Sequence, residues 1–365
     1  MTPAFSSTRG AITFAILMAF IVALPALMAE TGWLDRRDVY PAIPWKYGPF
    51  LWIQRQIFDK TTDVDVAFIG SSHIWNAIDT PQVEKYFSER LGHPADVITL
   101  GWPWNGFDAT YIIGRDLLQH RRVHTLVIDD EGFDSTPHNH SSRWFRIGDN
   151  TEALADLPLD SKIALYGGAV LGMPRLLVSL VRPDLLDDPF KARDTFWDNY
   201  YRAPNVAANL GALRARIGWG VTPDFVPYKP QKHAMPADVV LYSAATRNEF
   251  NVIGPRSSPY QLHFMRKLAL LCKEHGTRLV FLVTPRVDIP DQSTVPVREL
   301  FPEVVGAPAD LIGVPQGRLF AGMPLAERLK LFYESAHVNE NGQTYFTHLI
   351  EPMLFNLYAR SFEHN

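Results

Sequence analysis

The stretch "VDVAFIGSSHIWNAIDTPQVEKYFSERLGHPADVITLG", residues 64–101, decides the fold class. Two short apolar runs, residues 64–70 and 95–101, each end at a glycine. Between them, residues 80–92 place apolar side chains at helical spacing. The stretch therefore predicts a strand, a helix and a second strand.

The same alternation continues along the chain. The apolar run 123–130 follows a helical pattern over 109–120, and the run 277–285 follows a helical pattern over 258–276. Apolar strands that alternate with helices are typical of a mainly parallel sheet covered on both faces. We therefore expect an α/β fold, a three-layer sandwich built around such a sheet.

Composition narrows the function classes. The 365 residues include 35 Lys and Arg against 39 Asp and Glu, a balance that gives no electrostatic footprint for nucleic acid. The single cysteine, Cys272, excludes an intrachain disulfide and a cysteine-based metal site, and its apolar neighbours favour a buried core position.

The N-terminus predicts a location. Residues 11–29, "AITFAILMAFIVALPALMA", form an uncharged run long enough to cross a bilayer as a helix. Arg9 precedes the run and favours an inside amino end. Ala26 and Ala29 would permit cleavage as a signal peptide, but Leu27 fits that site poorly, so an uncleaved anchor over 1–30 is favoured. Either interpretation places residues 31–365 on the outer side of the membrane.

The remaining chain divides by composition. Residues 31–60 are rich in proline and aromatics and form a juxtamembrane segment whose aromatics lie either at the membrane interface or against the domain. Residues 61–365 form the main domain, with an insertion at about 135–250. Within it, the apolar stretch 161–181 carries Lys162 and Arg175, which favours a helix packed on the domain or resting near the bilayer over a second span. Aromatics further along the insertion anchor a loop or stack on sugar rings: Trp197, Tyr200, Tyr201 and Trp219.

Two serines follow the first strand, in Gly70-Ser71-Ser72-His73. Small polar residues make turns and helix caps, but the carboxyl end of a strand is also where open α/β sheets place their sites. A serine nucleophile needs a histidine to take its proton and an acid to orient the imidazole. Near the carboxyl terminus, Glu334 precedes His337 by three residues and supplies both types of group.

These pieces together resemble the SGNH hydrolases, also called GDSL-like esterases. The resemblance implies that Ser72 is the nucleophile, with Ser71 standing where the family usually has Asp. It further implies that His337 is the base and that Glu334 stands in place of the family's Asp. No cofactor or metal is implied.

The oxyanion hole matches this family less well. The resemblance points to the backbone N–H groups of Ser72 and Gly101 and to the amide of Asn105. After the third strand the family has an Asn, whereas this chain has Asp129 and Asp130, and an ionised acid cannot donate a hydrogen bond to an oxyanion.

Within the family, the chain looks like the membrane-anchored branch of polysaccharide O-acetylation and teichoic-acid D-alanylation proteins. That resemblance implies an extracytoplasmic O-acyltransferase, with acetyl the leading acyl group, on the periplasmic side of a bacterial inner membrane. The acceptor would be a cell-surface or exported polysaccharide, and the donor would come through a membrane-bound O-acyltransferase. A carbohydrate esterase or deacetylase, or a catalytically silent scaffold that binds a glycan or membrane partner, remains as an alternative.

Three further histidines are interpreted mainly as structural residues. His73, next to the proposed nucleophile, begins a helix or fills the pocket rim. His138 and His140, with Asp134 nearby, have the look of a metal cluster, but a solvated loop is the favoured interpretation.

Overall fold

The computed structural model describes most of the chain. The described residues are 7–44, 48–102, 104, 106–129, 137–138, 140–149, 151–186, 258–286, 305–314, 316–332 and 337–360. Several residues singled out in the sequence lie outside these ranges: Asn105, Asp130, Asp134, Trp197, Tyr200, Tyr201, Trp219 and Glu334.

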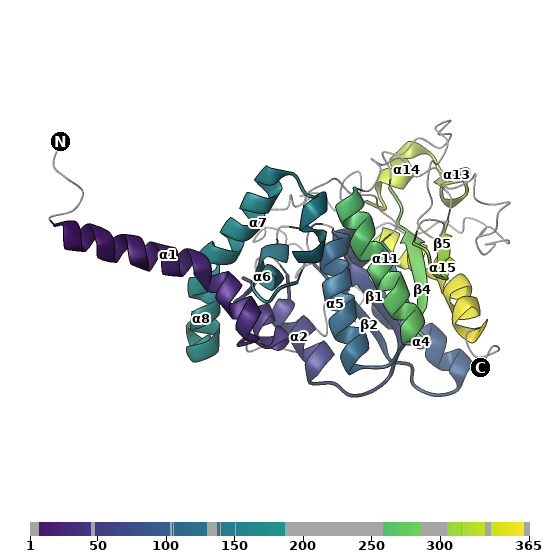
Figure 1. Cartoon of the computed structure of the whole chain (residues 1–365). Helices are drawn as coiled ribbons and strands as arrows, with labels where there is room; N and C mark the ends of the chain where they lie inside the picture. The colour runs from purple at the N-terminus through teal and green to yellow at the C-terminus, as the bar shows by residue number, and fades with distance from the viewer. Residues whose placement is uncertain are drawn as a thin grey trace.

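The centre of the molecule is a five-stranded sheet in the order β2-β1-β3-β4-β5, and every pairing is parallel (Figure 1). The expected parallel α/β sheet is therefore confirmed. Its fifth strand, at one edge, was not foreseen. The strands are β1 (Val64–Gly70), β2 (Val97–Gly101), β3 (Val123–Asp129), β4 (Arg278–Val283) and β5 (Asp310–Gly313).

Helices pack on both faces of the sheet because side chains along each strand alternate between two cores. Ala67 and Ile69 of β1 face one cluster, and Val66 and Phe68 face the other. The first cluster is covered by α2 (Phe50–Phe58), α5 (Phe107–His120) and α11 (Pro259–Glu274). The second is covered mainly by α3 (Ser72–Ala77), α4 (Thr80–Leu91) and α15 (Glu340–Arg360).

Local sequence sets the ends of these helices. Asp79 caps α4 by accepting from the Gln82 N–H, and Gly92 ends it in the left-handed region at φ 72°. Ser258 caps α11 in the same way. Cys272 of α11 is buried in the core, as the sequence predicted.

The direction of the strand order reverses between β1 and β3. From β1 the chain crosses to β2 on one side, whereas from β3 it proceeds to β4 and β5 on the other. Open α/β sheets bind ligands at such a reversal, outside the carboxyl ends of the strands. Ser71 and Ser72 directly follow β1, and Asp129 ends β3.

An N-terminal helix, α1 (Thr8–Thr31), projects from this domain (Figure 1). Among the described residues, α1 and the stretch Leu159–Val181 are long and apolar enough to cross a membrane. The Ser7 hydroxyl caps the start of α1, and Gly32 ends it in the left-handed region. The expected apolar helix is thus present, with no charged side chain between Gly10 and Ala29.

The segment after α1 packs into the domain. It forms a short 3-10 helix, η1 (Arg36–Ala42), followed by α2. Tyr40 and Trp52 of this segment are buried in the core, so the interface role considered for its aromatics does not hold for them. Trp33, by contrast, is 63% exposed.

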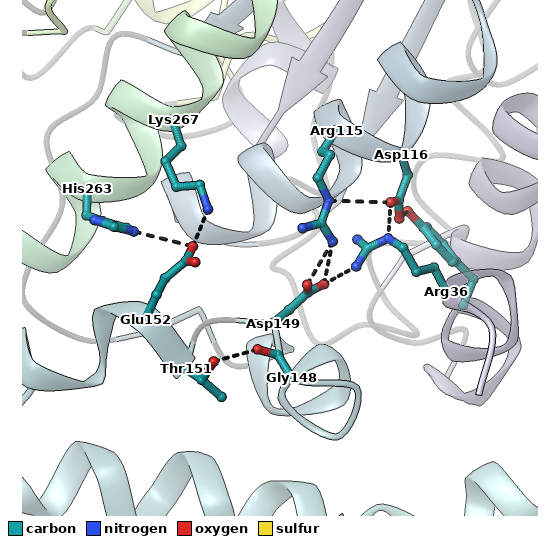
Figure 2. A network of polar contacts seen from close by, with 10 residues as sticks. Arg36, Arg115, Asp116, Gly148, Asp149, Thr151, Glu152, His263 and Lys267 are labelled. Carbon is teal, nitrogen blue, oxygen red and sulfur yellow. Dashed lines mark hydrogen bonds and ion pairs between the residues drawn. The ribbon is translucent and has the colours of Figure 1, made fainter. Parts of the chain in front are cut away.

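Buried ion pairs fasten η1 to the domain (Figure 2). Arg36 pairs with Asp116 of α5 and with Asp149, and Arg115 binds Asp149 at 2.8 Å. The Tyr40 hydroxyl donates to Asp116 at 2.7 Å. Because each buried carboxylate meets an arginine, removing one partner would leave an uncompensated charge. The helix α1 is therefore joined to the domain by a fixed segment.

Candidate active site

The structure brings Ser72 and His337 together. The Ser72 Oγ lies 2.8 Å from the His337 Nε2, although the two residues are 265 positions apart in the chain. That is hydrogen-bond distance, and it is the reach that a nucleophile and its general base require. Ser72 is only 5% exposed.

Ser72 is held by the junction between β1 and α3. It is the first residue of α3, and the Ser71 hydroxyl caps the helix by accepting from the His73 N–H at 3.1 Å. First-turn N–H groups have no acceptor within their own helix, so the Ser72 N–H is a donor beside its own hydroxyl.

His337 is held by the segment before α15. Asn339 lies two residues later, and its carbonyl oxygen accepts from the Asn341 N–H at 3.0 Å and the Gly342 N–H at 3.2 Å. Its amide nitrogen donates to the Lys330 oxygen at 2.7 Å. Asn339 thus caps α15 and ties its start to Lys330, which holds the chain just after His337.

The region of α3, which begins with Ser72, is hydrogen-bonded to α15, the helix that follows His337. On α15, the Gln343 amide donates to the Ile78 oxygen at 2.8 Å, and the Thr347 hydroxyl donates to the Ala77 oxygen at 3.2 Å. Thr347 also accepts from the Asp79 N–H at 2.9 Å. The contact between Ser72 and His337 therefore rests on a hydrogen-bonded helix interface.

Gly342 is required for this arrangement. A Cβ at this position would overlap the Leu331 carbonyl oxygen and lie 2.8 Å from the Val338 Cβ. We expect Gly342→Ala to lower the free energy of unfolding by about 1–3 kcal/mol, the usual cost of overpacking. Displacing His337 by about 1 Å would also slow turnover on the order of 10²-fold.

The control for Gly342→Ala is Gly167→Ala. A Cβ at Gly167 would meet nothing within 4 Å. Urea unfolding and ester turnover, measured in detergent on both variants, should separate them clearly. Equal behaviour of the two variants would mean that the close approach at Gly342 does not hold His337 in place.

His73 contacts the base. Its ring lies over the His337 ring, with centroids 4.5 Å apart and planes tilted by 33°. His73 does begin α3, but it also packs against the imidazole and restricts the rotation of that ring.

Ser71 has a different partner from Ser72. Its N–H and its hydroxyl both donate to the Asp129 Oδ2, at 2.8 Å and 2.7 Å. A Cβ at Gly70 would lie 2.7 Å from the same oxygen, so only glycine lets β1 approach Asp129 this closely. The two adjacent serines are thus distinguished by geometry, and Asp129 acts as an acceptor that positions the turn. Sequence reasoning did not foresee this pair.

The oxyanion-hole candidates are only partly described. Gly101 pairs with Gly70 across the sheet, and a Cβ on Gly101 would lie 2.9 Å from the Trp75 Cβ. Gly101 therefore has a packing role, because it lets α3 lie close to β2. Asn105 and the proposed acid Glu334 lie outside the described residues.

The solvated-loop interpretation of His138 and His140 is wrong. Both side chains are buried, at 4% and 1% exposed. The His140 ring packs edge-on against Phe50, and His138 packs edge-on against Trp102. His-x-His with a nearby Asp was too weak a pattern for a metal site and left a solvated loop as the default, but aromatics from distant segments pack on both rings. Within the described ranges, no cluster of His, Cys, Asp and Glu is suited to a metal ion.

Burial of His140 should make stability depend on pH. Burial, and then the nearby His138 and Arg143, hold the pKa of His140 well below its ordinary value. The unfolded chain takes up a proton at about pH 6.5, whereas the folded chain resists it. The free energy of unfolding should therefore fall as pH drops below about 6.5, with a contribution of up to about 1.4 kcal/mol per pH unit.

Substitution tests this assignment. In His140→Gln that contribution should disappear from urea titrations between pH 7 and 5, while the matched change at exposed His93, His93→Gln, should retain it. An unchanged pH slope in His140→Gln would refute the assignment.

No family model, no curated protein and no solved structure matches this chain. The candidate site is therefore interpreted from its own geometry and chemistry.

Proposed function

We propose that this protein is a serine-dependent O-acyltransferase or esterase. The observation that carries the proposal is the 2.8 Å contact between the Ser72 Oγ and the His337 Nε2 at the carboxyl end of β1. A buried hydroxyl in contact with an imidazole is the pair that acyl transfer through a covalent enzyme intermediate needs. The position at the strand-order reversal supports a ligand site there.

The reaction has two halves. His337 Nε2 takes the proton from Ser72 Oγ as that oxygen bonds to the acyl carbon of an ester. The carbon–oxygen bond to the leaving alcohol then breaks, and His337 returns the proton to that alcohol. In the second half, His337 activates a sugar hydroxyl or a water, which attacks the acyl-enzyme and releases Ser72. The sequence adds Glu334, whose carboxylate would orient the Nδ1 of His337.

The oxyanion would be held mainly by backbone. The Ser72 N–H is the first-turn donor of α3, and Gly101 and Asn105 are the further candidates from the sequence. Asp129 accepts two hydrogen bonds from Ser71 and so contributes to the shape of the turn rather than to oxyanion binding. Losing one donor costs about 2.7–4 kcal/mol of transition-state stabilisation in a serine protease, which slows such chemistry without abolishing it.

The family and the substrate class belong to the same proposal. A parallel sheet with helices on both faces supports an SGNH-like three-layer fold. The apolar helix α1 supports a membrane anchor. The extracytoplasmic placement of the domain is proposed from Arg9, which precedes the apolar run. We infer an exported or cell-surface polysaccharide as the acceptor and an acyl donor delivered through a membrane-bound O-acyltransferase.

A covalent label tests the nucleophile. The full-length chain in detergent should react with a fluorophosphonate, and mass spectrometry of its peptides should place the adduct on Ser72. Reaction with p-nitrophenyl acetate in the presence of oligosaccharides would then separate transfer, seen as acetylated sugar, from hydrolysis. Absence of a Ser72 adduct together with absence of turnover would contradict the proposal.

A silent scaffold is the second candidate. It is favoured by the acidic Asp129 at the end of β3, where the resembled family has an amide donor. A scaffold would bind glycan with unchanged affinity after Ser72→Ala and would resist the fluorophosphonate.

A further inference from the structure

We propose that α7 (Leu159–Leu171) and α8 (Met173–Val181) lie within the membrane leaflet on the domain's side of the bilayer, alongside α1. The occupant of their exposed apolar face is lipid. Two independent observations carry this inference: the depth at which α1 contacts the pair, and the side chains that the pair exposes. It rests on α1 spanning the membrane and not on the chemistry of Ser72.

The contacts with α1 set the depth. The Tyr166 hydroxyl of α7 donates to the Val22 oxygen, in the second half of α1. Further along α1, Leu24 and Met28 pack with Met173 and Leu176 of α8. Figure 1 shows α7 and α8 beside this half of α1, while the first half projects away.

A span of the hydrocarbon core uses about 20 helical residues at about 1.5 Å each. α1 has 24 residues, so every stretch of that length within Thr8–Thr31 includes Val22. The residue would lie roughly 8–14 Å below the domain-side surface of the core. Tyr166 touches Val22, so α7 must reach into the same leaflet.

The exposed side chains of the pair fit that environment. Leu159, Ile163 and Leu171 form a stripe along α7 and are 72%, 63% and 83% exposed. On α8, Val181 is 76% exposed, and Leu177 is 38% exposed. The opposite sides of both helices are buried against α1 and the domain. An apolar stripe of this kind in water marks an interaction surface, and this one continues the lipid-facing surface of α1.

The α7–α8 pair is bent, and arginines of the domain hydrogen-bond to its backbone near the bend. Both features argue against a second transmembrane helix. The helix breaks at Gly172, next to Pro174. At the break, Arg143 donates to the Gly168 oxygen at 3.1 Å, and the buried Arg146 donates to the Ala169 oxygen at 2.8 Å. A Cβ at Gly172 would overlap the Arg146 guanidinium as it lies here, so both arginines lie directly against the break. Broken helices at membrane depth are stable where protein groups satisfy the backbone.

Charged residues lie at the two ends of the α7–α8 pair. Asp160 and Lys162 lie at the start of α7, and Arg182 and Asp184 follow α8, whereas residues 163–174 carry no charge. Arg175 turns back to the domain and donates to the Ala42 oxygen at 3.0 Å. The charged ends can therefore stay at the headgroups while the bend enters the leaflet.

The test uses cysteine labels on the full-length chain. The native Cys272 is buried, so the unsubstituted chain serves as the labelling blank. Cysteines are placed singly by Leu171→Cys on α7, Ile16→Cys on α1 and Leu325→Cys on α14 (Leu325–Leu329), all at exposed apolar positions. Each variant carries an environment-sensitive NBD dye and is reconstituted into phosphatidylcholine and phosphatidylglycerol vesicles, with and without brominated acyl chains.

We expect the dye at Leu171→Cys to show blue-shifted emission that brominated lipid quenches, as at Ile16→Cys, while Leu325→Cys shows neither effect. Quenching at Ile16→Cys without quenching at Leu171→Cys would overturn the inference. A blue shift at Leu171→Cys that brominated lipid leaves unquenched would mean that protein covers the stripe, which also overturns it. Absence of quenching at Ile16→Cys would remove α1 from the bilayer and the inference with it. The Ser72 chemistry would stand in each case.

Discussion

Ser72→Ala is expected to lower kcat for p-nitrophenyl acetate on the order of 10⁶-fold, the loss seen when a serine protease loses its nucleophile. The Ser72 Oγ contacts the His337 Nε2 at 2.8 Å, so the substitution removes both the attacking atom and the partner of the base. The backbone around the site should not change, because the hydroxyl of Ser72 neither caps α3 nor bonds Asp129.

Ser71→Ala is the matched control for that result. Ser71 caps α3 and donates to Asp129, so its loss should lower the free energy of unfolding by about 0.5–2 kcal/mol. Turnover should remain well above that of Ser72→Ala, because the hydroxyl of Ser71 is occupied by Asp129. Measurements of kcat and of urea unfolding on both variants decide the matter. A greater loss of kcat in Ser71→Ala than in Ser72→Ala would show that Ser71, and not Ser72, is the nucleophile.

Four of the five strands were predictable because each is an apolar run next to a helical pattern. β5 has only four residues and lies at the edge of the sheet, so its periodicity is too short to recognise. The pairing of Ser72 with His337 was predictable from chemistry, since a weak nucleophile needs a base. Spacing alone could not show it across 265 residues.

Other contacts depend on neighbours that no local pattern contains. Asp129 appeared as a missing donor after β3, but the adjacency of β1 and β3 turns it into the acceptor for Ser71. His140 was assigned to a solvated loop because its sequence pattern is a weak metal signal, yet Phe50 from α2 packs against its ring. Tertiary packing determines the partners of both Asp129 and His140, and the local sequence does not contain those partners.

The second large effect concerns the base. We expect His337→Gln to lower kcat on the same order as Ser72→Ala, about 10⁶-fold. Glutamine fits the space and can hydrogen-bond to Ser72, but its amide cannot take the proton. The neighbouring ring provides the control: His73→Gln removes the ring contact with His337 and leaves a base at 2.8 Å from the serine. It should reduce kcat far less than His337→Gln does.

A double variant tests whether Ser72 and His337 act as one unit. Once the nucleophile is gone, the base has no proton to take, so the double variant of Ser72→Ala and His337→Gln should be no slower than either single variant. A residue that merely supports the fold would instead add its own loss to that of Ser72→Ala. An additional loss in the double variant of more than about tenfold, equivalent to about 1.4 kcal/mol, would therefore place His337 outside the proton transfer. Near-complete non-additivity, with urea unfolding unchanged, requires that the two side chains share one chemical step.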